Sequence, residues 1–161
     1  MQTLTEAGPD LDEDVAALEA LTRVLVGIAW DGAHAAPPGV TFPQTRLLLI
    51  LDGLGRVPSS RLAAAMGVNA SSVTRLADRL ETHGYLARGR DRQNRSVVTV
   101  EVTETGRRAV AHVLERRRTA FRALLDRMPP AQRKAATAAA RRIVKAAAGV
   151  PAIGTAGPGP L

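Results

Sequence analysis

The chain has 161 residues, which suits one domain or one lobe of an intertwined dimer, and a formal net charge of +7, which favours a polyanionic partner such as nucleic acid or an anionic membrane. It contains no cysteine, which excludes disulfides and cysteine-based redox sensing, and its three histidines are too widely separated to suggest a zinc site. Two Phe, one Tyr and one Trp are too few to suggest that it binds single strands by base stacking.

The N-terminal segment, residues 1–10, is polar with Gly and Pro, and we expect a flexible arm. Its acidic character does not fit a secretory signal, and the longest aliphatic run, residues 47–51, is far too short to span a membrane. We therefore expect a cytoplasmic protein with no membrane partner. The sequence also lacks a phosphate-cradling glycine loop, a cysteine nucleophile and a paired-carboxylate motif, so we expect no enzyme, no cofactor and no metal.

Two helices precede the central region of the chain. Apolar residues recur every three or four positions from Leu11 onward, with acidic residues at the N-terminal end, and this pattern predicts a helix within residues 11–36. A second helix opens at Pro43 and is rich enough in Leu and Ile to be buried on several sides. Gly53 and Gly55 are expected to mark its end.

The next stretch predicts two short helices at a sharp angle, a helix-turn-helix. The first starts at Pro58 and ends at Gly67, because glycine easily takes the positive φ of a helix C-terminus. Asn69 caps the second helix, residues 70–83, whose apolar residues recur on one face and which Gly84 ends. Such a pair has no core of its own, so we expect it to rest on the preceding buried helix.

Polar side chains cover the outer surface of these two helices. Hydroxyl groups near a helix N-terminus, with Arg one turn further on, suit a helix that enters a major groove, because hydroxyls meet phosphates and Arg meets guanine edges. The candidate DNA-binding residues here are Ser59, Ser60, Asn69, Ser71, Ser72, Thr74, Arg75 and Arg79. The alternative is an ordinary amphipathic helix with a solvated face.

Two β-prone runs, residues 85–88 and 96–102, then predict a hairpin. Its polar connection, residues 89–95, is expected to bring four further DNA-binding candidates together against the single acid Asp91: Arg88, Arg90, Arg92 and Arg95. Guanidinium groups on a protruding loop suit phosphates and a narrow minor groove. The alternative is a solvent-exposed turn whose charged residues serve only solubility.

These stretches together resemble the MarR-type winged-helix transcription regulators, over about residues 12–147. Three segments carry the resemblance. Residues 60–86 are similar to the family's recognition-helix region, and residues 88–102 are similar to its wing. Residues 102–106, Val-Thr-Glu-Thr-Gly, match the family's Leu-Thr-x-x-Gly at the end of the wing.

The wing departs from the family in one place. Asn94-Arg95-Ser96 stands where the family usually shows Asp-x-Arg, so that an amide replaces the acid and a serine replaces the arginine. Arg92 or Arg95 is then left to make the groove contact, and the local charge still favours DNA.

Two further helices follow the wing. Apolar periodicity predicts one from the cap residue Thr103 to about residue 128, and another over about residues 131–148. Their narrow stripes, Ala-rich in the last helix, have little to pack against inside one small domain, so we expect a homodimer held by the terminal helices, which the resemblance also implies. Residues 149–161, rich in Gly, Pro and Ala, are expected to form a disordered tail.

The expected fold is mainly α with a small β-wing, a winged helix-turn-helix plus N- and C-terminal dimerisation helices. We expect a single MarR-like domain at residues 11–148. Within it, residues 41–103 form the winged helix-turn-helix DNA-binding region, and residues 11–36 and 104–148 form the dimerisation helices.

The resemblance implies a homodimeric, sequence-specific regulator of double-stranded DNA, bound to a pseudo-palindromic operator and acting as a repressor released by a small aromatic or phenolic ligand. In the family, effectors bind between the dimerisation helices and the winged helix, where the candidates are Trp30, His34, Phe42 and Arg46. The alternative is that Trp30 and Phe42 belong to the core and Arg46 is solvated. Two other functions stay open, a nonspecific or architectural DNA binder and a winged-helix module that binds protein partners.

Overall fold

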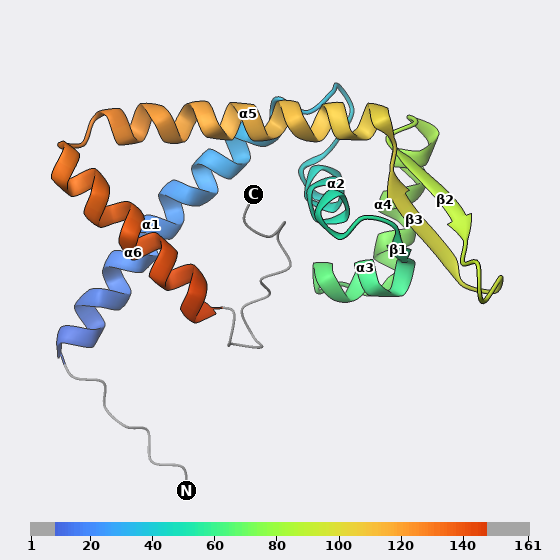
Figure 1. Ribbon diagram of the computed structural model, residues 1–161, viewed down its shortest axis with the longest axis horizontal. Helices are drawn as coiled ribbons and strands as arrows, with labels where there is room; N and C mark the ends of the chain where they lie inside the picture. Colours follow the sequence, from blue (N-terminus) through green and yellow to red (C-terminus); the bar gives the residue numbers. More distant parts are fainter. Residues whose placement is uncertain (1–8, 148–161) are drawn as a thin grey trace, which may run out of the picture.

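The computed structural model describes residues 9–147, and Figure 1 shows how its helices and strands are arranged. In chain order the elements are α1 (Pro9–Ala33), α2 (Phe42–Leu54), β1 (Val57–Pro58), α3 (Ser59–Met66), α4 (Ala70–Thr82), β2 (Leu86–Arg90), β3 (Val98–Val102), α5 (Glu104–Asp126) and α6 (Pro130–Ala147). The predicted fold class, mainly helical with a small wing, is confirmed. The predicted tail lies outside the described residues, as does the predicted arm apart from residues 9 and 10, which belong to α1.

The elements form a winged part and a helical extension (Figure 1). Helices α2, α3 and α4 gather with the sheet at one end of the molecule, while α5 runs away from them toward α6. Helix α1 packs along α5, and α2 packs against α3, α4, α5 and β3. The winged part is thus joined to the extension through α5 and through the connection from α1 to α2.

Helix α2 lies at the centre of the hydrophobic core. Leu47 and Leu51 are completely buried, and the residues between them are buried too. Each fully buried Leu or Ile contributes roughly 1.5–3 kcal/mol to stability. The same cluster takes in the inner faces of α3 and α4: Leu62, Ala63, Met66, Val73, Ala77 and Leu80. The prediction that the two short helices rest on the preceding helix is therefore confirmed.

Local sequence signals define the turn between α3 and α4. Gly67 takes a positive φ of 66° at the end of α3. The side-chain oxygen of Asn69 accepts a hydrogen bond of 2.8 Å from the Ser72 N–H, which caps α4. Both signals were predicted, and they fix the angle at which α4 leaves α3.

One predicted helix boundary is wrong, and a second is confirmed only for Gly55, which caps the end of α2. Helix α3 begins at Ser59, because Pro58 has extended backbone angles (φ −56°, ψ 142°) and belongs to β1. Helix α2 continues through Gly53 and ends at Leu54, and only Gly55, with a φ of 70°, takes the backbone conformation that favours glycine.

The sheet has three strands in the order β1-β3-β2, where the sequence predicted a two-stranded hairpin. The additional strand, β1, pairs with β3 through Val57 opposite Val100 and Pro58 opposite Thr99. Strand β2 runs through residue 90, into the predicted loop, and pairs with β3 over residues 98–102. The protruding loop is consequently shorter than predicted, and its base is held from both sides of β3.

Thr103 joins the wing to α5 and to the end of α4. Its side-chain oxygen accepts a hydrogen bond of 3.1 Å from the Gly106 N–H, which caps α5 as predicted. Its hydroxyl also donates to the Gly84 carbonyl at 2.6 Å, just beyond α4. Gly106 leaves no room for a side chain, because a Cβ there would overlap the backbone carbonyl of Tyr85. These contacts fix α4, the wing and α5 relative to one another.

Charged residues fasten α1 to α5. Arg116 on α5 lies 2.9 Å from the Asp31 carboxylate on α1, and the hydrogen bond from Arg116 holds the pKa of Asp31 below 3.8. Arg117 turns inward over Gly32 and donates to the Ala29 carbonyl at 3.4 Å. Burial lowers the pKa of this arginine.

The terminal helices expose much of their apolar surface. Helix α6 buries none of its described residues, and the apolar residues of α1 remain 41–54% exposed along most of its length. Exposed members of these stripes are Leu11, Val15, Leu18, Leu21, Val24, Leu25, Val26, Phe121, Leu124, Ile143 and Val144. Across residues 9–147, no helix combines the length and the apolar character needed to cross a bilayer.

Candidate nucleic-acid interface

Helix α4 divides into a buried face and an exposed face, as the sequence predicted. Val73, Ala77 and Leu80 are buried against the core. On the other side, Arg75 and Arg79 are exposed, and within the described residues neither guanidinium has an ion pair or a hydrogen bond. Two cationic groups one turn apart are therefore available to an anionic partner.

The hydroxyls at the start of α4 are engaged within the helix. Ser71 donates to the Asn69 side-chain oxygen at 2.9 Å, and Thr74 donates to the Ala70 carbonyl at 3.0 Å. Ser72 is half-buried and contributes its backbone N–H to the cap. In these positions the exposed hydroxyl oxygens of Ser71 and Thr74 can still accept hydrogen bonds, since a hydroxyl carries two lone pairs.

The two serines at the start of α3 differ. Ser60 is exposed, but Ser59 is half-buried and donates to the Val98 carbonyl at 3.4 Å. Ser59 therefore fastens α3 to β3, while Ser60 alone faces outward.

The tip of the wing is organised by two short polar side chains. Asp91 accepts hydrogen bonds from the N–H groups of Gln93 (2.8 Å) and Asn94 (3.0 Å). The bond from Asn94, then that from Gln93, holds the pKa of Asp91 below its ordinary value. The Asn94 side chain in turn accepts from the Ser96 N–H at 3.1 Å and from the Ser96 hydroxyl. The unusual Asn94-Arg95-Ser96 sequence thus closes its own turn without the acid and the arginine typical of the family.

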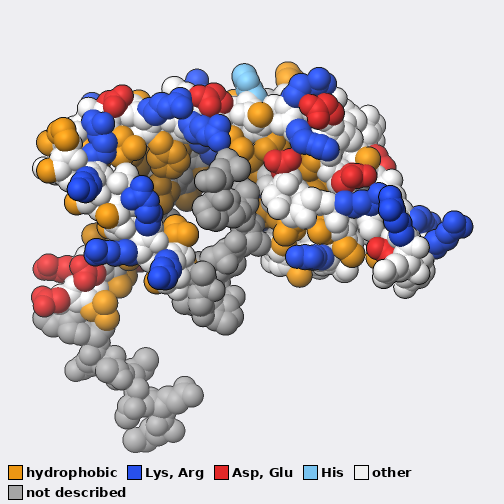
Figure 2. Space-filling view, in the orientation of Figure 1, with side chains coloured by type: hydrophobic (Ala, Val, Ile, Leu, Met, Phe, Trp, Pro, Cys, Tyr) orange, Lys and Arg blue, Asp and Glu red, His pale blue; other side chains and the backbone are white. Residues whose placement is uncertain are grey.

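The wing arginines are presented on this turn. Arg90 donates to the Arg95 carbonyl at 3.1 Å, across the loop. The side chains of Arg92 and Arg95 are exposed and make no ion pair among the described residues. Figure 2 shows the wing as a basic protrusion at the right of the molecule.

Arg88 does not join the other three arginines. Its guanidinium lies 2.7 Å from Asp78 and 2.9 Å from Glu81, both on α4, and donates to the Thr74 carbonyl at 3.3 Å. The sequence grouped Arg88 with the wing loop because the two lie close in the chain. In the fold it links β2 to α4, and its charge is largely balanced by two carboxylates.

Arg56 lies at the base of the wing, and the sequence did not single it out. It donates to the Thr99 hydroxyl at 3.2 Å and to the Arg90 carbonyl at 3.1 Å. It follows Gly55 and precedes a strand of two residues, so no local pattern in the sequence marks it. Only the pairing of β1 with β3 brings it to the wing.

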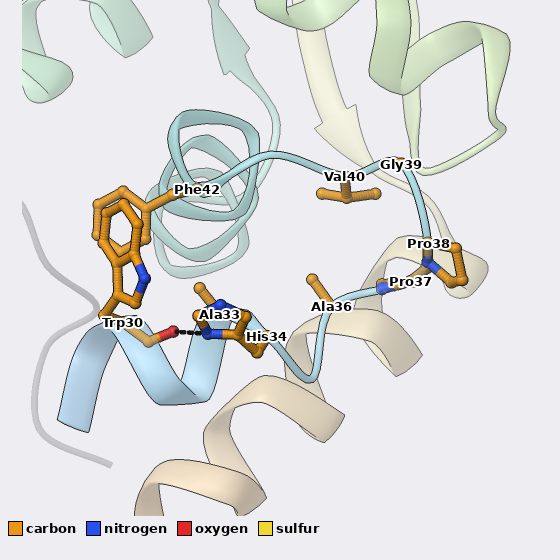
Figure 3. Close-up of a pocket in the computed structure, with 9 residues that line it drawn as sticks. All are labelled: Trp30, Ala33, His34, Ala36, Pro37, Pro38, Gly39, Val40 and Phe42. Carbon is orange, nitrogen blue, oxygen red and sulfur yellow. Dashed lines mark hydrogen bonds between the residues drawn. The ribbon is translucent and has the colours of Figure 1, made fainter. Parts of the chain in front are cut away.

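Three of the four effector candidates meet in one hollow of about 270 Å³ (Figure 3). The rings of Trp30 and Phe42 stack with centroids 4.7 Å apart, and the His34 ring lies edge-on to Trp30. The Nδ1 atom of His34 is 2.9 Å from the Trp30 carbonyl oxygen. Pro37, Pro38, Gly39 and Val40 complete most of the lining.

The fourth candidate, Arg46, is not part of this hollow. It donates to the Met66 carbonyl at 3.0 Å, at the C-terminal end of α3. Trp30 is 52% exposed, so it does not belong to the core either. Among residues 9–147, no three His, Asp or Glu side chains gather as a metal site would require.

Comparisons with known proteins agree with this architecture. The model of the MarR family matches residues 40–98, which span α2, the helix-turn-helix and the wing loop. The chain is 28% identical over 96 residues to the uncharacterized HTH-type transcriptional regulator YfiV of Bacillus subtilis, covering 60% of each protein. It is 37% identical over 68 residues to the HTH-type transcriptional repressor MdtR of the same organism, covering 42% of this chain and 44% of MdtR. The matches thus span about half the length of these curated relatives.

Solved structures extend the similarity to nearly the whole chain. RV1404 from Mycobacterium tuberculosis is 30% identical with a TM-score of 0.74, over 90% of this chain and 98% of RV1404. A MarR family protein from Bacillus stearothermophilus is 27% identical with a TM-score of 0.72, over 83% and 95% of the two chains. The curated relatives are named as transcriptional regulators and not as enzymes, as the sequence predicted. The chain therefore belongs to the MarR family of winged-helix transcription regulators.

Proposed function

We propose that the chain is a homodimeric, sequence-specific repressor that binds double-stranded DNA and is released by a small aromatic or phenolic ligand. The observation that carries this proposal is the pair of exposed arginines on α4, Arg75 and Arg79, displayed beside a basic wing. A regulator of this kind acts where the chromosome lies, so the proposal includes a cytoplasmic location.

The two basic elements suit different parts of a duplex. Helix α4 enters the major groove, where Arg75 and Arg79 reach base edges. The hydroxyls of Ser71 and Thr74 donate to phosphate oxygens once they rotate away from their acceptors within the helix. The wing lies along the backbone, and Arg92 and Arg95 meet phosphates or a narrow minor groove. The first element supplies sequence preference, and the second supplies affinity that falls with salt.

The exposed stripes of α1, α5 and α6 support a homodimer. A helix such as α6, with no buried described residue, gains little from its own chain and is stabilised by a second copy. In the proposed organisation, residues 11–36 and 104–148 form the dimer and residues 41–103 form the DNA-binding region of one domain at 11–148. Two α4 helices would then meet successive major grooves of a pseudo-palindromic operator.

The ligand proposal rests on the hollow around Trp30, His34 and Phe42. Aromatic faces and proline rings favour a flat apolar ligand, and the exposed imidazole of His34 offers a hydrogen-bond partner to a phenol. Because Arg46 binds the end of α3, it is not the partner for a ligand carboxylate. A bound ligand would change the spacing of the two α4 helices, and the name of MdtR, a repressor, supports that direction of control.

Fluorescence anisotropy on labelled DNA from upstream of the protein's own gene tests the proposal, with a scrambled duplex as control, at low and physiological salt. A preference of roughly a thousandfold that survives salt supports an operator-specific regulator. Equal and steeply salt-dependent binding to both duplexes favours a nonspecific or architectural binder instead. No binding to either duplex favours a winged-helix module that binds protein.

A further inference from the structure

Arg56 occupies the point where α2, β1 and the wing converge. Its Nε donates to the Thr99 hydroxyl on β3 at 3.2 Å, and its Nη2 donates to the Arg90 carbonyl at the end of β2 at 3.1 Å. Its Nη1 lies 3.9 Å from the Glu101 carboxylate. Arg56 directly precedes β1 in the chain, and its guanidinium thus binds both of the other strands of the sheet.

Gly89 provides the space for this arrangement. A Cβ on Gly89 would lie 2.5 Å from Nη2 of Arg56 and 3.3 Å from the Thr99 hydroxyl. Gly89 is not among the glycines with a positive φ, so its backbone conformation suits any residue. The absence of a side chain at Gly89 thus leaves the place that the guanidinium of Arg56 occupies, and a Cβ there would push this flexible side-chain end aside.

The sheet needs such a brace because β1 is weak. It has only two residues, and one of them, Pro58, has no N–H to donate to β3. Beyond Arg90, the wing is a loop closed by its own side chains, so its direction is set at its base. Arg56 supplies there the cross-links that the short strand lacks.

We propose that Arg56 is a positioning residue for DNA binding. It holds the wing loop against the rest of the winged part, so that Arg92 and Arg95 meet the DNA. Gly89 is its steric counterpart. The inference rests on the proposed DNA-binding function. The competing role is direct, because Arg56 also lines a hollow together with Arg90 and Arg92, where it could bind a phosphate itself.

The substitution G89A separates the two roles, because it displaces the guanidinium and leaves every charge in place. Loss of two hydrogen bonds at the wing base is expected to weaken DNA binding about tenfold and to speed amide hydrogen exchange in residues 88–98 of the free protein by a similar factor. R56K should act in the same direction, because an ammonium cannot span acceptors on two strands. G27A is the matched control for the exchange measurement, since nothing of the same chain lies within 4 Å of the added Cβ.

Two results would overturn the proposal. If G89A changes neither the amide exchange of the wing nor the DNA affinity, the hydrogen bonds of Arg56 do not position the wing. Full DNA affinity in R56K would assign Arg56 a charge contact with phosphate. If G89A fails to fold, as judged by circular dichroism, the variant T99V replaces it, because T99V removes only one of the two acceptors of Arg56. It is expected to change DNA affinity and wing exchange about threefold, and an absence of change in both would contradict the proposal.

The exchange experiment needs no DNA, so the two proposals fail separately. If the wild-type protein binds no duplex, the proposed function is wrong, while faster wing exchange in G89A and R56K would still establish that Arg56 holds the wing. If the wild-type protein binds DNA and the variants match it in both assays, only the positioning role is wrong.

Discussion

Replacing Arg88 by alanine removes the ion pairs and the hydrogen bond that link β2 to α4. Arg88 is 27% exposed and its two carboxylate partners are 53% and 40% exposed, so solvent screens each ion pair to about 0.5–1 kcal/mol. The hydrogen bond to the Thr74 carbonyl contributes about as much. We expect R88A to lower the free energy of unfolding by about 1–2 kcal/mol, and the melting temperature by roughly 3–6 °C.

A double-mutant cycle with E81Q tests the link itself. Chemical denaturation of the wild type, R88A, E81Q and the double variant should give a coupling free energy of about 0.5–1 kcal/mol. R79A is the matched control, because Arg79 is an exposed arginine of α4, the helix that carries Glu81, and its side chain has no partner among the described residues. The effect of R79A on the free energy of unfolding should stay within about 0.5 kcal/mol. Strictly additive effects of R88A and E81Q would refute the argument that Arg88 ties β2 to α4.

Three further predictions concern other parts of the molecule. G106A should destabilise the protein by several kcal/mol in urea unfolding, because its Cβ overlaps a backbone carbonyl that cannot swing aside; a change below about 1 kcal/mol would contradict this. Because the hydrogen bond from Arg116 lowers the pKa of Asp31, the stability that this pair contributes is present above about pH 4 and is lost as the pH falls through the lowered pKa. Unfolding curves at pH 7 and pH 3 measure this loss, and the D31N variant should lose less stability between the two pH values than the wild type. R75A should relax preference at one base position by about 1–3 kcal/mol, whereas R92A should weaken binding to all duplexes and flatten its salt dependence.

Much of the fold could be predicted because its signals are local. Gly67 and Asn69 mark the turn between α3 and α4 by their own backbone and side-chain chemistry. The buried residues of α4 repeat every three or four positions, and the continuous run of Leu and Ile in α2 is buried throughout. Strand β1 could not be predicted, because two residues carry no alternation. The same limit explains the misplaced start of α3, since a proline suits both an extended residue and a first helical turn.

The candidate site was predicted in part for the same reason. Exposed residues such as Arg75 and Arg92 owe their positions to one element each. The positions of Arg46 and Arg88 could not be predicted, because their partners, the Met66 carbonyl and the carboxylates of α4, are set by packing between elements. Arginine is long enough to choose among several acceptors, and the sequence does not say which one the fold brings near.

The contacts of Thr103 fix the first turn of α5 to the winged part, so a tilt of this helix moves the winged part with it. A helix of 23 residues is about 34 Å long, and its first turn is bound to the ends of both α4 and the wing. A tilt of roughly 5° about its far end displaces the winged part by about 3 Å, close to the roughly 3.4 Å rise of one base pair. In a dimer, an angular change too small to disturb the core would therefore move the whole winged part by about one step of the duplex.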